Sequence, residues 1–193
     1  MITLIEGPRA TGKTFLLDSF FNQNTDPDTI YYKFLFAKYL QDFDIKKYDD
    51  GPGVHYFSIA NVITILELNK TLLKDKNIVF DRCIFSAYVW SIYRNRLPKD
   101  ELMTEFNKIL QSDLFEDCQI IYLTRPDGIV ESNRQKDYFD QFQNYEKEKL
   151  YFDNIFSDTS SLINNSDKRT SFIEFTNNFD EPSIQHFCKL LNK

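Results

Sequence analysis

Eight residues close to the start of the chain constrain its fold more than any other stretch. Residues 7–14 read Gly-Pro-Arg-Ala-Thr-Gly-Lys-Thr and fit the pattern G-x-x-x-x-G-K-[ST]. The apolar run 1–6 has the length of a strand, and Phe15–Leu17 with Phe20 and Phe21 are spaced as on one side of a helix. A strand, a tight loop and a helix predict backbone N–H groups and a helix N-terminus that bind phosphate. The alternative is a plain glycine-rich turn, which the flanking strand and helix disfavour.

Each part of this loop has an expected role in binding a nucleoside triphosphate. The Lys13 ammonium would reach the β- and γ-phosphates, and the Thr14 hydroxyl would ligate Mg²⁺. The sequence therefore predicts ATP and Mg²⁺ as cofactors. The residues expected to bind the phosphates are Gly7, Pro8, Arg9, Ala10, Thr11, Gly12, Lys13 and Thr14.

Composition narrows the classes of function that remain. The net charge of −6 argues weakly against binding along a nucleic-acid backbone, although a local basic cleft stays open. No apolar run approaches the ~20 residues of a membrane span, and we expect neither a signal peptide nor a membrane partner. Cys83, Cys118 and Cys188 are far apart and odd in number, which favours reduced thiols and a cytoplasmic protein. His55 and His186 have no partner at metal-ligand spacing, so no zinc site is expected.

The rest of the chain alternates runs of strand length with helical patterns. This alternation predicts an α/β fold, an open and mostly parallel sheet of about five strands with helices on both faces, in a single domain 1–193. The helix 54–74 is expected to bury its apolar residues, Leu72 among them. Further strands are predicted at 29–36, 77–81, 119–124 and 171–176, helices at 84–95, 100–114, 129–136, 138–156 and from Asp180 onward, and a polar surface loop at 157–170.

Three chemically distinctive segments follow the carboxyl ends of predicted strands. The loop 7–14 follows the first strand, Asp81 ends the third and Arg125 follows the fourth. Ligands of parallel sheets gather at this edge, so we expect the three segments to lie together. Asp81 would hold Mg²⁺, and the planar guanidinium of Arg82 suits a phosphate. The alternative for this pair is a helix-capping aspartate beside a surface arginine.

The segment Phe80–Tyr88 resembles the D-R-x-x-x-S segment of thymidylate kinases. Residues 5–7, Ile-Glu-Gly, resemble the approach to the loop in these kinases and in the related deoxynucleoside kinases. Residues 57–61 resemble the helix that presents a stacking phenylalanine to the acceptor base. The resemblance spans most of the chain and implies a P-loop kinase, with Lys13 and the loop amides on the donor phosphates and Thr14 with Asp81 on Mg²⁺.

The same resemblance implies residues for the acceptor and for a lid. Arg82 would grip the acceptor phosphate or the transferring group, and Phe57 with Asn61 would bind the acceptor. A lid-like segment at about 125–150 would bring Arg134 over the phosphates, with Lys136 and Arg125 behind it. Core packing of Phe57 and a solvated helix face for Arg134 are the alternatives.

Three positions depart from the family pattern. Arg9 stands where thymidylate kinases carry an acidic residue, Val62 where they carry an arginine, and Cys83 where an aromatic residue is frequent. These three differences do not argue against phosphoryl transfer, but they leave the identity of the acceptor undetermined. Arg9 could neutralise charge in the transition state, as an arginine finger supplied in cis does.

Together these observations predict Mg-ATP-dependent phosphoryl transfer to a nucleotide acceptor. The alternative is a kinase acting on a hydroxyl of a deoxynucleoside or of a nucleic acid, and a non-kinase P-loop NTPase is disfavoured. A hydroxyl acceptor needs a nearby carboxylate, and Glu6 and Asp81 are the nearest in sequence. A nucleic acid would need a basic cleft, for which 94–99 holds the local cluster of Arg94, Arg96 and Lys99. A homodimer is left open.

Overall fold

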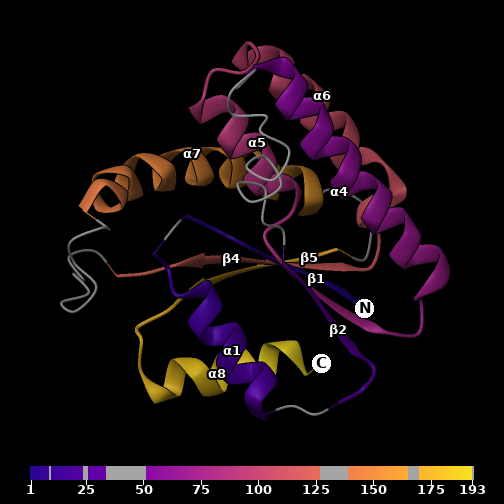
Figure 1. The fold of residues 1–193 in the computed structure, drawn as a ribbon, viewed down its shortest axis with the longest axis vertical. Coiled ribbons are helices and arrows are strands. Elements are labelled where there is room, and N and C mark those ends of the chain that lie inside the picture. The colour runs from indigo at the N-terminus through magenta and orange to yellow at the C-terminus, as the bar shows by residue number, and fades with distance from the viewer. Residues whose placement is uncertain (9, 24–25, 34–50, 127–138, 165–169, 193) are drawn as a thin grey trace.

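Five parallel strands form one sheet through the middle of the molecule (Figure 1). The structure is a computed structural model that describes residues 1–8, 10–23, 26–33, 51–126, 139–164 and 170–192, without the side chains of 139–144 and 160–164. The order across the sheet is β2-β3-β1-β4-β5. The strands are β1 (Ile2–Glu6), β2 (Thr29–Lys33), β3 (Asn77–Asp81), β4 (Cys118–Thr124) and β5 (Ser171–Thr176).

The three central strands are buried on both faces. Every residue of β1 and β4 is buried, and β3 is buried from Ile78 to Asp81, whereas the residues of edge strand β2 are only partly buried or exposed. This burial explains why the central strands are nearly continuous apolar runs rather than alternating ones. A short apolar run is therefore the signal by which the sequence reveals them.

Helices cover the sheet on both faces (Figure 1). On one face lie α1 and α8, which contact each other, and on the opposite face lie α4, α5, α6 and α7. Asp180 caps α8 by accepting from the Ser183 N–H at 2.9 Å, with Pro182 in the first turn. The helices are α1 (Lys13–Gln23), α4 (Pro52–Leu72), α5 (Ile84–Tyr93), α6 (Lys99–Gln111), α7 (Phe139–Asn164) and α8 (Glu181–Leu191), and a short 3₁₀ helix spans Asp113–Phe115.

The described residues form two apolar cores, one on each face of the sheet. Aromatic side chains fill the larger core, which lies between the sheet and α4–α7. The Phe85 ring stacks on Phe156 of α7 at 4.6 Å and meets Phe106 of α6 edge-on at 5.2 Å. Phe156 also stacks on Tyr122 of β4 at 4.3 Å. Three helices are thus fixed to each other and to the sheet through one set of rings.

The predicted fold class is confirmed, and two local expectations are wrong. The stretch 157–164, predicted as part of a loop, continues α7, where the Thr159 hydroxyl donates to the Ile155 carbonyl at 2.6 Å and is buried. Intrahelical bonding lets polar residues stay helical, which composition alone does not show. Leu72 is 73% exposed, on the same outer face of α4 as Leu68. The predicted helix 129–136 lies outside the described residues.

No helix in the described part of the chain is long and apolar enough to cross a membrane.

Replacing Phe106 with alanine should lower the free energy of unfolding by about 3–5 kcal/mol, because the fully buried ring would leave a cavity. Phe15, which is 46% exposed on α1, is the matched control. Phe15→Ala should change the free energy of unfolding by less than about 0.5 kcal/mol. Urea unfolding of both variants checks this. Equal losses would mean that the Phe106 ring is not a core contact.

Candidate phosphate-transfer site

The carboxyl ends of the three central strands lie side by side. Ile5 of β1 is in register with Asp81 of β3, and Glu6 is in register with Tyr122 of β4. The loop 7–14, Asp81 and Arg125 therefore meet at one edge, as the strand pattern predicts.

Close packing requires glycine at two positions of the loop. Gly7 has a φ of +134°, and a Cβ there would lie 2.2 Å from the Leu123 carbonyl oxygen of β4. Gly12 has a φ of +79°, and a Cβ there would lie 2.4 Å from Asn177 Nδ2. Both positions require glycine because of the positive φ and of a close neighbour, which is a backbone carbonyl at Gly7 and the buried side chain of Asn177 at Gly12. The loop is thereby clamped between β4 and the residues that follow β5.

Asn177 is a part of the site that the sequence analysis missed. It is fully buried, its Nδ2 donates to the Thr11 carbonyl at 3.0 Å, and its Oδ1 accepts from the Phe179 N–H at 2.9 Å. Its backbone N–H donates to the Thr124 carbonyl at 3.0 Å. Asn177 therefore ties the loop to the ends of β4 and β5. The available signal was its position, because Asn177 directly follows the predicted strand 171–176, at the edge of the sheet where Asp81 ends the strand 77–81.

The Lys13 ammonium turns inward to the loop. Its Nζ donates to the carbonyl oxygens of Gly7 at 2.9 Å and Pro8 at 2.5 Å, and to Thr11 Oγ1 at 3.1 Å. Burial, and next the nearby Arg82 guanidinium, lower the pKa of Lys13 well below its ordinary value, while neighbouring carboxylates oppose this. Two cations thus repel each other in a poorly solvated place, and a bound anion would relieve that repulsion.

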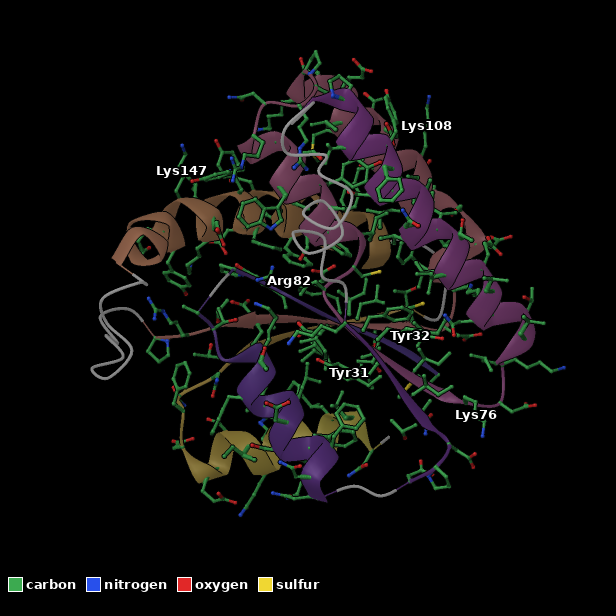
Figure 2. All side chains as sticks on the ribbon, in the orientation of Figure 1. Tyr31, Tyr32, Lys76, Arg82, Lys108 and Lys147 are labelled. Carbon is green, nitrogen blue, oxygen red and sulfur yellow. The ribbon has the colours of Figure 1, made fainter. Side chains whose placement is uncertain are left out.

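Arg82 reaches the same loop from the turn between β3 and α5 and lies near the centre of the molecule (Figure 2). Its Nη1 donates to the Gly7 carbonyl at 3.2 Å and to Ser86 Oγ at 3.3 Å. Its φ is +70°, in the left-handed region that residues other than glycine rarely adopt. The Arg82 side chain is partly buried and hydrogen-bonded to the loop, rather than fully solvated.

Asp81 has one engaged and one open carboxylate oxygen. Oδ2 accepts from the Tyr31 hydroxyl at 3.2 Å and lies 4.0 Å from Lys33 Nζ, whereas Oδ1 is buried without a hydrogen-bond donor among the described residues. An open buried carboxylate oxygen suits Mg²⁺, which takes oxygen ligands and few protein carboxylates. Thr14, in the first turn of α1, can add its hydroxyl. Both residues carry oxygen atoms of the kind that Mg²⁺ takes as ligands.

The described residues hold no group of three or more His, Cys, Asp or Glu side chains that could bind a metal by themselves. A magnesium ion here would depend on substrate phosphate oxygens for the rest of its ligands.

Two further carboxylates border the site. Glu6 is fully buried, and burial raises its pKa to about 7. Its Oε1 accepts from the Phe85 N–H at 3.1 Å, and its Oε2 accepts from the Ser86 hydroxyl at 2.5 Å. Glu148 of α7 is also buried and acts on Lys13 as a nearby negative charge. No pattern in the sequence singles out Glu148, because it lies among several charged residues on one helix.

No protein-family model and no curated protein matches the chain. Solved structures do match. A thymidylate kinase from Candida albicans is 16% identical with a TM-score of 0.60, over 99% of this chain and 90% of that one. The chain has a P-loop kinase fold. NadR, solved in complex with NR, is 14% identical with a TM-score of 0.61, over 99% of this chain and 48% of that one. The chain thus spans about half the length of NadR, and the thymidylate kinase-like fold inferred from the sequence is confirmed.

Not every predicted residue of this kinase fold joins the loop. Phe57 is 43% exposed on α4, so core packing is ruled out for it, and Asn61 Nδ2 donates to the Phe57 carbonyl at 2.7 Å. No contact of the described residues joins either side chain to the loop. Arg125 is buried, with its guanidinium 4.1 Å above the Tyr145 ring of α7. Arg9, Arg134 and Lys136 lie outside the described residues.

Asn177→Ala should weaken binding of inorganic tripolyphosphate by about tenfold, because the Thr11 carbonyl and the Phe179 N–H would lose their buried partner. Asn178, exposed and adjacent, provides the matched control, and Asn178→Ala should bind tripolyphosphate like the wild type. Titration calorimetry measures both. Equal affinities for the two variants would show that Asn177 does not shape the loop.

The raised pKa of Glu6 also predicts how stability changes with pH. Its carboxyl group has an ordinary pKa of 4.5 and a folded pKa of about 7, so between these values the native state holds a proton that the unfolded chain releases. The stability that the protonated Glu6 contributes is therefore fully present below pH 4.5 and is lost as the pH rises through the folded pKa of about 7.

Relative to Glu6→Gln, the free energy of unfolding of the wild type should fall by up to about 3 kcal/mol from pH 4.5 to pH 8. Denaturant unfolding at several pH values tests this. Parallel curves for the two proteins would contradict the assignment.

Proposed function

We propose that this protein transfers the γ-phosphoryl group of ATP to a nucleotide, with Mg²⁺. One observation carries the proposal: Lys13 Nζ and Arg82 Nη1 both donate to the Gly7 carbonyl oxygen, at 2.9 and 3.2 Å. Two cations from separate segments converge on the turn where the P-loop begins. A group with several anionic oxygens between them would satisfy both, and a phosphoryl group in transfer is such a group.

Positioning and charge neutralisation would supply the rate enhancement. Lys13 and the loop N–H groups would hold the donor phosphates, and Arg82 would grip the transferring group. Thr14 and Asp81 would hold Mg²⁺, which when bound neutralises charge on the β- and γ-phosphate oxygens. Arg9 and Arg134 are proposed as additional cations that approach the phosphates. No covalent intermediate is required.

The state of the carboxylates supports a phosphate acceptor over a hydroxyl. A hydroxyl acceptor would need a base to take its proton, and Glu6 is fully buried with both oxygens engaged. Asp81, the other candidate that is nearest in sequence, is the proposed metal ligand. A nucleotide acceptor carries its own ionised oxygen and needs no such base. Phe57 and Asn61, on the exposed side of α4, are proposed to bind its base.

The decisive experiment measures ATP consumption by the purified protein against a panel of nucleoside monophosphates, nucleosides and DNA ends. We expect at least one monophosphate to accelerate ADP formation more than tenfold. If only a nucleoside or a DNA end accelerates ADP formation, the acceptor is a hydroxyl group and the proposed phosphate acceptor is overturned. If no acceptor changes the rate of ATP hydrolysis, the kinase assignment is overturned. A cytoplasmic location is part of the same proposal.

Lys13→Ala should lower the transfer rate by on the order of 10²-fold or more, because it removes a buried cation from the phosphates. Lys108, exposed on α6, is the matched control, and Lys108→Ala should keep the wild-type rate. The coupled assay for ADP reports both. Because Lys13 also satisfies loop carbonyls, its variant must first be shown to be folded by circular dichroism. A folded Lys13→Ala protein with near-normal turnover would contradict the role.

A further inference from the structure

Three side chains form a hydrogen-bonded row behind the phosphate loop. Glu6 Oε2 accepts from the Ser86 hydroxyl at 2.5 Å, and Ser86 Oγ accepts from Arg82 Nη1 at 3.3 Å. We propose that Glu6 is a positioning residue, which orients the Arg82 guanidinium through the Ser86 hydroxyl. The inference rests on the proposed function, because it assigns Arg82 to the transferring phosphoryl group.

When Glu6 is ionised, above its pKa of about 7, the chemistry of the three groups allows one direction for these hydrogen bonds. A guanidinium only donates, and an ionised carboxylate only accepts. The single hydroxyl proton of Ser86 therefore points to Glu6, and an oxygen lone pair is left for Arg82. A side chain at position 6 that could donate to Ser86 would let the hydroxyl turn its proton toward Arg82 and repel it.

Glu6 also fixes the backbone from which Arg82 projects. The side chain of Cys83, at the N-cap of α5, makes no capping hydrogen bond, and the carboxylate of Glu6 accepts the Phe85 N–H instead. A negative charge at a helix N-terminus is favourable, and here it comes from a strand 79 residues away in sequence. Arg82, with its φ of +70°, lies in the turn that this contact closes.

Glu6 itself has no direct route to a substrate. Its exposed fraction is 0%, and both of its oxygens are occupied within the protein. Any effect of Glu6 on catalysis must therefore pass through Ser86, through the start of α5, or through its charge on neighbouring groups. The first two routes both end at Arg82, which makes the proposal separable from a general effect on stability.

A double-mutant cycle tests the proposal with Glu6→Gln and Arg82→Ala. In the wild-type background, Glu6→Gln should lower kcat by about 10- to 100-fold, as a misplaced catalytic group does, with KM for ATP changed less than about threefold. In the Arg82→Ala background, the same change should alter kcat by less than about twofold, because the group that it positions is gone.

Ser86→Ala provides a second arm, which keeps the test decisive if Glu6→Gln does not fold. It should lower kcat in the same range as Glu6→Gln and should likewise lose its effect when Arg82 is alanine. Ser91 is the matched control: it is a buried serine of the same helix, bonded to His55 Nδ1 at 2.8 Å. Any loss caused by Ser91→Ala should be equal in both backgrounds. Equal losses for Glu6→Gln or Ser86→Ala in the two backgrounds would overturn the positioning role.

The same cycle is run on the affinity for inorganic tripolyphosphate, measured by calorimetry, which separates this inference from the proposed function. Binding with non-additive losses, but with no transfer to any acceptor, would overturn the kinase assignment and support the positioning role. Phosphoryl transfer to an acceptor, together with additive losses of affinity in the cycle, would support the kinase assignment and overturn the positioning role. A wild-type chain that neither binds tripolyphosphate nor transfers phosphate would overturn both.

Discussion

The carbonyl group of Gly7 is the point on which the rest of the site depends. Its oxygen accepts from both Lys13 and Arg82, and its Cα lies so close to the Leu123 carbonyl that no side chain fits. The end of β1 can take this position only because β3 and β4 flank it on both sides. The parallel sheet is therefore what brings an arginine from one crossover and a lysine from another onto one oxygen atom.

Around that oxygen the chain balances buried charge with buried charge. Two cations face the carboxylates of Glu6, Asp81 and Glu148, all of which are almost inaccessible to water. Burying charges is costly, and mutual attraction with full hydrogen bonding offsets the cost. The Lys13 ammonium is held by oxygens of the loop itself, whereas one oxygen of Asp81 has no donor in the described part of the chain. The site is thus arranged for ligands of both signs.

Local patterns in the sequence were enough to predict the strands, the loop 7–14 and the edge of the sheet at which they meet. Asp81 could be placed because it ends an apolar run, and β5 was predicted at its observed bounds. The position of Asn177 directly after a predicted strand was visible, but its role was not, since its partner Thr11 lies 166 residues earlier and no local pattern records that contact. The exposure of Leu72 and the length of α7 were predicted wrongly for a related reason. Tertiary packing, rather than composition, decides both.

The strand order has a consequence for how the chain assembles. Residue Ile2 pairs with Ile78 on one side and with Cys118 on the other, so β1 joins segments that lie far from it in the sequence. The surroundings of the loop 7–14 are therefore built from contacts between distant parts of the chain, and contacts of that kind form slowly in folding. The contact between Asn177 and the Thr11 carbonyl spans 166 residues, so a fragment that ends before Asn177 lacks the side chain that holds this loop against β4 and β5.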